Sequence, residues 1–229
     1  DPDLEVISPD VPVDVTLENY SAQVDYIGLT AAEISNRTLV PLALTTITNG
    51  TGQLQIGDIP DADYLALILK ADLSTLFFAS DDGLTFSMAA KYAELPSDFD
   101  AGITVDASAD FLPLFDKTQT GFEYQGAQAG RIFWNLENSG TADMYGVIYS
   151  PECSQCPTVY ATVPGDESNY TVPLAELGIT PSEDDVVLIV AGNLSGFDQN
   201  AFNPLTLFGQ PISTISLWTN FTIPALFKK

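Results

Sequence analysis

Histidine is absent from this chain, cysteine occurs only twice, and basic residues are scarce. Without histidine there is no Ser-His-Asp or Cys-His nucleophile system, no histidine-ligated metal centre and no histidine proton shuttle. Seven Lys and Arg stand against 31 Asp and Glu, which gives a formal net charge of −24. Such a surface repels phosphate backbones and anionic headgroups, so nucleic acids and acidic membrane surfaces are excluded as partners.

Long apolar runs are also missing. No segment approaches the ~18–20 residues that cross a membrane, and no basic start followed by an apolar stretch marks a signal peptide. The chain begins at Asp1 without Met, as an exported protein does once its leader has been removed. We therefore expect a secreted, cell-surface or periplasmic protein without a membrane span.

What the chain does have is the composition of a folded β protein: 45% hydrophobic residues, including 13 Phe and nine Tyr. Short β-branched and aromatic segments recur between turn signals, a pattern that predicts a sandwich and not βαβ units. Helix signals are confined to Ala31–Ser35 and Ser87–Leu95. The expected strands are Val11–Leu17, Leu39–Thr48, Gly52–Ile56, Tyr64–Leu69, Thr85–Ala89, Ile103–Val105, Gly130–Leu136, Met144–Tyr149, Thr158–Val163, Tyr170–Pro173, Val186–Ala191 and Thr214–Ile223.

A weak internal repeat indicates two domains. Asp63–Ser74 aligns without gaps on Asp184–Ser195, with five of twelve residues identical and a spacing of 121 residues. Because 229 residues exceed a typical single domain of about 100–150 residues, we expect domains over residues 1–112 and 113–229. The boundary is expected near Phe111–Thr120.

Four segments of the second half, Arg131–Leu136, Tyr145–Tyr149, Asn169–Leu177 and Val186–Asn193, resemble a fibronectin type III or related immunoglobulin-like domain. The resemblance covers roughly residues 118–224, and the first half shares it only through the repeat. It implies an all-β protein of two tandem immunoglobulin-like or fibronectin type III-like sandwiches. A Val stands where that family has a Tyr in the penultimate strand. Such modules mostly bind, space or adhere.

The chain's cysteines, Cys153 and Cys156, lie three residues apart in a loop. A redox pair needs its first cysteine at a helix N-terminus, but both flanks read as β. A zinc site needs four ligands, which two cysteines without histidine cannot supply. The pattern favours a structural disulfide over free thiols or redox and metal chemistry, and hence an oxidising compartment.

Carboxylates cluster around one expected hairpin. Asp58, Asp61 and Asp63 precede a strand, and Asp81 and Asp82 follow it, which makes them candidate oxygen ligands for calcium. The spacing differs from that of an EF-hand loop, and a solvated acidic turn is the alternative. Ser182–Asp185 is a weaker version of the same pattern. No cofactor other than calcium is expected.

Six of the ten asparagines stand in N-x-S/T sequons, which is more than chance predicts for this composition. They indicate a glycosylated surface protein, although threonine beside a turn asparagine is also common in β proteins. The candidate glycosylation sites are Asn19, Asn36, Asn49, Asn169, Asn193 and Asn220.

Taken together, the residues predict a non-catalytic exported module for adhesion or binding. Its partner would be a protein or a glycan at a cell surface. The alternative is self-association, as a structural subunit of a surface layer or filament assembled through strand edges. An enzyme accessory domain or carboxylate hydrolase is a third possibility, but no pair of carboxylates stands out as catalytic. Trp134 and Trp218 lie in apolar strands and are expected in the core.

Overall fold

The computed structural model describes residues 8–34, 38–58, 63–71, 84–95, 98–108, 111–194 and 212–221. These residues form fourteen β-strands, two single-turn 3-10 helices and one four-residue α-helix, α1 (Leu174–Leu177). The all-β class expected from the strand pattern is therefore confirmed. Within the described ranges, no helix is long and apolar enough to cross a membrane.

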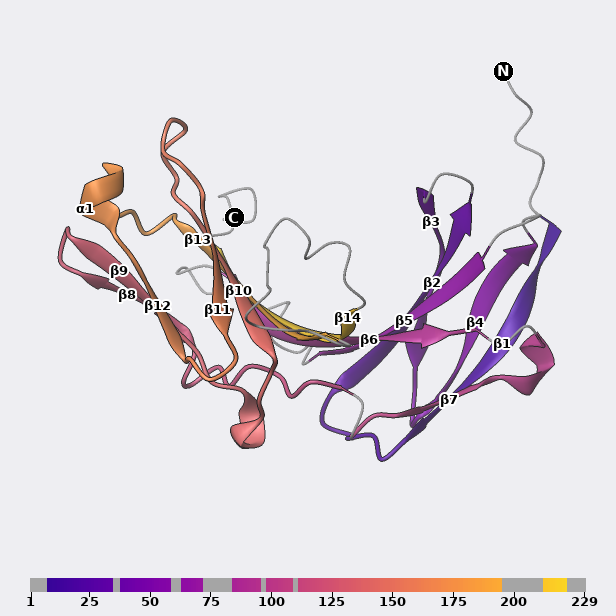
Figure 1. The fold of residues 1–229 in the computed structure, drawn as a ribbon. Helices are drawn as coiled ribbons and strands as arrows, with labels where there is room; N and C mark the ends of the chain where they lie inside the picture. The colour runs from indigo at the N-terminus through magenta and orange to yellow at the C-terminus, as the bar shows by residue number, and fades with distance from the viewer. Residues whose placement is uncertain are drawn as a thin grey trace, which may run out of the picture. The chain divides into compact units, whose positions relative to one another are not determined.

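The chain divides into two compact units. The first comprises Asp1–Ala71 and Ala90–Phe111, and the second comprises Asp72–Ala89 and Leu112–Lys229. Each unit combines a three-stranded sheet with its own strands of an eight-stranded sheet, so each is a sandwich (Figure 1). Strand β6 (Leu84–Glu94) is shared, since its residues up to Ala89 belong to the second unit and those from Ala90 to the first.

In the first unit, one sheet has the order β4-β1-β7, and the other runs β3-β2-β5 with β6 beside β5. Alternation along β1 explains the first sheet, because Val13, Val15 and Leu17 are buried while the residues between them are exposed. The strands are β1 (Ser8–Glu18), β2 (Asp25–Ile34), β3 (Thr38–Ile47), β4 (Thr51–Asp58), β5 (Asp63–Ala71) and β7 (Ile103–Asp106).

In the second unit, the sheet β12-β9-β8 faces the sheet β11-β10-β13-β14, with β6 beside β14 (Figure 1). The β6 segment is held on both sides: the Ser216 hydroxyl donates to the Met88 carbonyl at 3.3 Å, and the Phe115 N–H donates to the Ser87 hydroxyl at 2.8 Å. The strands are β8 (Gly121–Gln125), β9 (Ala129–Phe133), β10 (Met144–Ser150), β11 (Val159–Pro164), β12 (Asn169–Val172), β13 (Val186–Leu194) and β14 (Ile212–Phe221).

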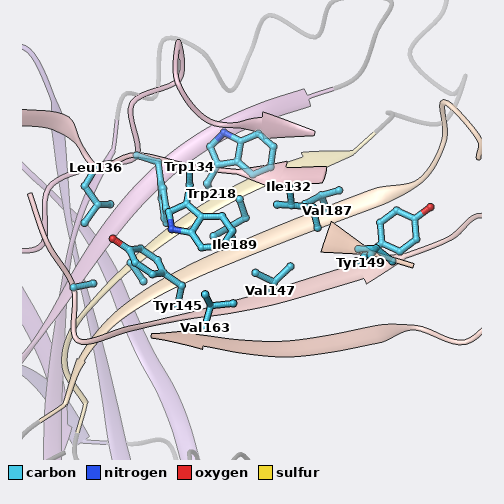
Figure 2. Packing of buried hydrophobic residues seen from close by; sticks show 14 of the residues in the cluster. Ile132, Trp134, Leu136, Tyr145, Val147, Tyr149, Val163, Val187, Ile189 and Trp218 are labelled. Atoms are coloured by element: carbon cyan, nitrogen blue, oxygen red, sulfur yellow. The ribbon is translucent and has the colours of Figure 1, made fainter. Parts of the chain in front are cut away.

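The core of the second unit fills the space between its sheets. Trp134 and Trp218, each 1% exposed, lie within it, as the sequence predicts (Figure 2). The ring of Tyr145 on β10 packs against Trp134, with centroids 5.1 Å apart. The aliphatic side chains around them belong to β9, β10, β11 and β13 and include Ile132, Val147, Val163, Val187 and Ile189.

Six strands recur in the same order in the two units. Strands β1 to β6 correspond to β9 to β14, and the strand pairs β1·β4, β2·β3 and β2·β5 recur as β9·β12, β10·β11 and β10·β13. The two repeat segments start on β5 and just before β13, so they occupy equivalent positions. The units differ at one edge of the three-stranded sheet. In the second unit this edge is β8, which precedes β9 in the chain and pairs antiparallel with it. In the first unit it is β7, which follows β6 in the chain and pairs parallel with β1.

Both helix predictions were wrong over the described residues. Residues 31–34 belong to β2 and residues 87–94 to β6. Small residues caused both errors, since alanine-rich segments read as helical while tertiary packing overrides propensity. In β2, a Cβ at Gly28 would run into the Leu54 side chain of the other sheet, so the close packing of the two sheets requires glycine there. Glycine usually weakens a strand, which is why the sequence did not indicate one at this position. Strands β2 and β8 and helix α1 were not anticipated.

Candidate functional site

A pocket of about 470 Å³ lies in the second unit, where β9 ends and β12 begins. Three segments surround it: residues 116–119, residues 134–140 and the β11–β12 turn at 165–168. Ligand sites typically span about 300–1,000 Å³, so the pocket has the size of a small-ligand or side-chain site.

Backbone contacts hold the three segments together. The Trp134 N–H donates to the Ser168 carbonyl at 2.9 Å, and the Asp116 N–H donates to the Asn135 carbonyl at 2.9 Å. The β11–β12 turn sits so close to the preceding chain that a Cβ on Gly165 would run into the carbonyl oxygen of Ala142. The pocket is therefore part of the sandwich framework.

Asp116 is oriented by its own turn. Its Oδ1 accepts from the Thr118 N–H at 2.8 Å and from the Thr118 hydroxyl at 2.6 Å, and its Oδ2 accepts from the Gln119 amide at 2.9 Å. These bonds, the Thr118 hydroxyl first, lower the pKa of Asp116 below its ordinary value. The Gln119 side chain in turn accepts from Asn135 Nδ2 at 3.0 Å.

The charged side chains of the pocket are all acidic. The carboxylates of Asp116, Asp166 and Glu167 line it, the last two being exposed, and no lysine or arginine is among its lining residues. Trp134 and Tyr145 form its buried side, and burial raises the pKa of Tyr145 above its ordinary value. The described residues contain no group of three or more Cys, Asp or Glu side chains placed to hold a metal ion. The pocket is thus suited to a ligand that carries positive charge.

A second polar cluster lies inside the same unit around Asp185, which is 7% exposed. Its carboxyl group accepts from the hydroxyls of Tyr124, at 2.6 Å, and Tyr149. It also accepts from the backbone N–H groups of Glu152, at 2.9 Å, and Ser182, at 3.2 Å. Asp185 therefore joins β8, β10 and the two loops that meet there.

The two tyrosines of this cluster are held in their protonated form. Burial raises the pKa of Tyr124 and of Tyr149 well above the ordinary value, and the hydrogen bond to Asp185 adds to both shifts. Sequence reasoning grouped Asp185 with solvated carboxylates. Its position directly before the apolar run of β13 was the available signal that it faces inward, but nothing in the sequence pairs it with Tyr124 and Tyr149.

The proposed calcium ligands are only partly within the described residues. Asp58 ends β4 and Asp63 begins β5. Asp61, Asp81 and Asp82 lie outside the described residues, so the calcium site stays a prediction.

Cys153 and Cys156 are joined by a disulfide in the loop between β10 and β11, which is the pairing that the sequence favours. The loop is also closed by a hydrogen bond from the Cys156 N–H to the Cys153 carbonyl at 3.1 Å. The bond thus closes a tight local turn.

The sequons fall in different surroundings. Asn19 and Asn49 are exposed, and Asn169 is partly buried at the start of β12. Asn193 is partly buried, and its Oδ1 accepts from the Asp143 N–H at 3.1 Å. Asn220 lies in β14, and Asn36 is outside the described residues. Glycosylation of the six stays a prediction.

Each unit sets a three-stranded sheet against the sheet that carries the repeat strand, an arrangement that resembles the immunoglobulin-like sandwich. No family model matches the chain, and no curated protein matches it. Among solved structures it is similar to the FN1-FN3 domains of chicken CNTN1, with 10% sequence identity and a TM-score of 0.24. The similarity covers 81% of this chain and 58% of the other, so the chain spans less than two thirds of that structure.

Proposed function

We propose that the protein is a non-catalytic, exported binding module whose partner is a protein with a basic segment. The observation that carries the proposal is the acidic pocket of the second unit, which combines three carboxylates with no basic lining residue. A lysine or arginine side chain supplies the positive charge that such a pocket lacks. The net charge of −24 supports the same class of partner, because it attracts cationic surfaces over longer distances.

Non-catalytic binding fits the residues available at the pocket. Nucleophile and base pairs usually include a histidine or an activated cysteine; the chain has no histidine, and its cysteines are joined in a disulfide away from the pocket. Export is supported by that disulfide, since such bonds persist in oxidising compartments.

Binding of an acetylated, amidated tetra-arginine peptide tests the proposal. The double variant Asp166→Asn with Glu167→Gln should weaken its affinity at least about tenfold, or ~1.4 kcal/mol, because two pocket carboxylates are lost. The measurement is isothermal titration calorimetry at low and moderate salt.

The matched control removes the same charge elsewhere in the second unit. Glu176→Gln with Asp184→Asn replaces two exposed carboxylates that do not line the pocket. This control should bind the peptide within about twofold of the parent. Equal weakening in both double variants would show that the peptide senses only overall charge, and the pocket would then not be the site. A tetra-glutamate peptide should not bind.

The second candidate function is assembly of copies through strand edges. Strands β3 and β11 are edge strands, and each carries a large exposed apolar or aromatic side chain: Leu44 is 68% exposed and Tyr160 is 74% exposed. Unpaired edges with such side chains offer templates for pairing between chains.

If strand edges mediate assembly, sedimentation velocity should show the parent forming larger species as its concentration rises. A lysine on an edge strand opposes pairing, so Leu44→Lys with Tyr160→Lys should remain monomeric at the same concentrations. A parent that stays monomeric across the range, or a double variant that assembles equally well, would remove this candidate.

A further inference from the structure

The β3–β4 hairpin presents Asn49 at its tip. Asn49 has a φ of 52° and Gly50 a φ of 75°, the left-handed pair typical of a two-residue hairpin turn. The turn is closed by reciprocal bonds between Thr48 and Thr51, with N···O distances of 2.8 and 3.1 Å. Asn49 is exposed, and the structure gives its side-chain amide no hydrogen bond among the described residues. Asn49-Gly50-Thr51 is also a sequon.

An aromatic ring lies directly beside this turn. The Tyr20 ring packs on Gly50 so closely that a Cβ at that position would run into it. The backbone ties the same region together, because the Leu17 N–H donates to the Gly50 carbonyl at 2.7 Å. Tyr20 nevertheless remains 38% exposed, so part of this residue faces water beside the turn that carries Asn49.

Contacts with buried aromatic residues hold the Tyr20 ring in place. Its ring meets Tyr26 edge to face at 6.5 Å, and Tyr26, which is 4% exposed, meets Phe111 in the same manner at 6.3 Å. The Tyr26 hydroxyl also accepts from the Ser21 N–H at 3.2 Å, which fixes the chain just after Tyr20. The Tyr20 ring is therefore fixed by packing, although part of the residue is exposed.

The sequons at Asn19, Asn169 and Asn193 lack this combination. The Asn19 amide already donates to Asp106 Oδ1 at 3.2 Å. Asn193 is partly buried and hydrogen-bonded, and Asn169 is partly buried at a strand start. Asn49 alone of these unites a hairpin tip, an exposed side chain with no recorded hydrogen bond and a neighbouring aromatic face.

We infer that Asn49 carries an N-linked glycan whose first sugar packs on the exposed part of Tyr20. The apolar C–H face of a pyranose suits an aromatic ring, and the glycan then shields the part of Tyr20 that otherwise faces water. The inference rests on the export included in the proposed function, but not on the acidic pocket.

The test uses the full chain produced behind a cleavable secretion leader in a host that attaches N-glycans. Mass spectrometry should find Asn49 occupied. The Tm is then compared for the parent, Asn49→Asp, Tyr20→Ala and the two changes combined; aspartate keeps the left-handed turn accessible while removing the glycan. The glycan should raise the Tm by roughly 3 °C or more when Tyr20 is present, and by about nothing after Tyr20→Ala.

The same four chains made in a bacterial periplasm provide the glycan-free baseline, where Asn49→Asp should have the same effect with and without Tyr20. An unoccupied Asn49 would overturn the inference, and so would a glycan effect that survives Tyr20→Ala. Because the leader supplies export, either result counts against this site and leaves peptide binding at the pocket to its own test.

Discussion

Replacing Asp185 with alanine is expected to lower the free energy of unfolding by about 3–5 kcal/mol, the largest effect of any single polar substitution considered. The change removes the acceptor of the Tyr149 hydroxyl and of the Glu152 N–H. It also removes one of two acceptors of the Tyr124 hydroxyl, which donates to the Ser182 carbonyl as well, at 2.5 Å. Each donor left buried without an acceptor carries a desolvation cost of about 1–3 kcal/mol. Denaturant unfolding followed by tryptophan fluorescence measures the loss.

Asp184→Ala is the matched control, because Asp184 is the exposed neighbour of Asp185 on the same turn. It should change the unfolding free energy by no more than about 0.5 kcal/mol. If both substitutions had equally small effects, the Asp185 cluster would not be a structural element of the folded state.

The second large effect is a loss of stability at alkaline pH. The pKa values of Tyr124 and Tyr149 are raised in the folded state, so the folded state keeps two protons that the unfolded chain releases above about pH 10. Below that pH both states are protonated and this contribution is constant. Above it, the unfolding free energy should fall by up to about 1.4 kcal/mol per pH unit for each tyrosine, until the folded-state groups also ionise.

Denaturant unfolding between pH 9 and 12 measures this slope. Tyr124→Phe should make this slope less steep by the contribution of one proton, up to ~1.4 kcal/mol per pH unit. Tyr160→Phe is the control, since that side chain is 74% exposed and lies largely in water before and after unfolding. If Tyr124→Phe leaves the slope unchanged, the loss of stability at alkaline pH arises from general charge repulsion and not from Tyr124.

The strand pattern could be predicted because most strands alternate buried and exposed residues. In β1 the burial of Val13, Val15 and Leu17 follows directly from period-two spacing. The prediction failed where sheet packing required small residues, as at Gly28 in β2 and Ala90 in β6, which are buried but carry no strand propensity.

The polar sites were harder to predict, because they depend on contacts between distant residues. Asp185 meets Tyr124 and Tyr149 across 61 and 36 residues, respectively. The pocket likewise brings Asp116 and the β11–β12 turn to one site, although no local sequence pattern indicates that they lie near each other. The cysteines were the opposite case, since their pairing is local and depends on only three residues of separation.

The shared strand β6 has a consequence for dissecting the chain into fragments. A cut between Phe111 and Leu112 looks natural on the linear sequence, but it would separate Ser87 and Met88 from Phe115 and Ser216, their hydrogen-bonding partners. A fragment that begins at Leu112 would lack a strand of its own sandwich, while its companion would carry that strand with its edge exposed. Fragments meant to fold independently must therefore supply residues 84–89 a second time, for instance by appending them through a linker to the C-terminal half.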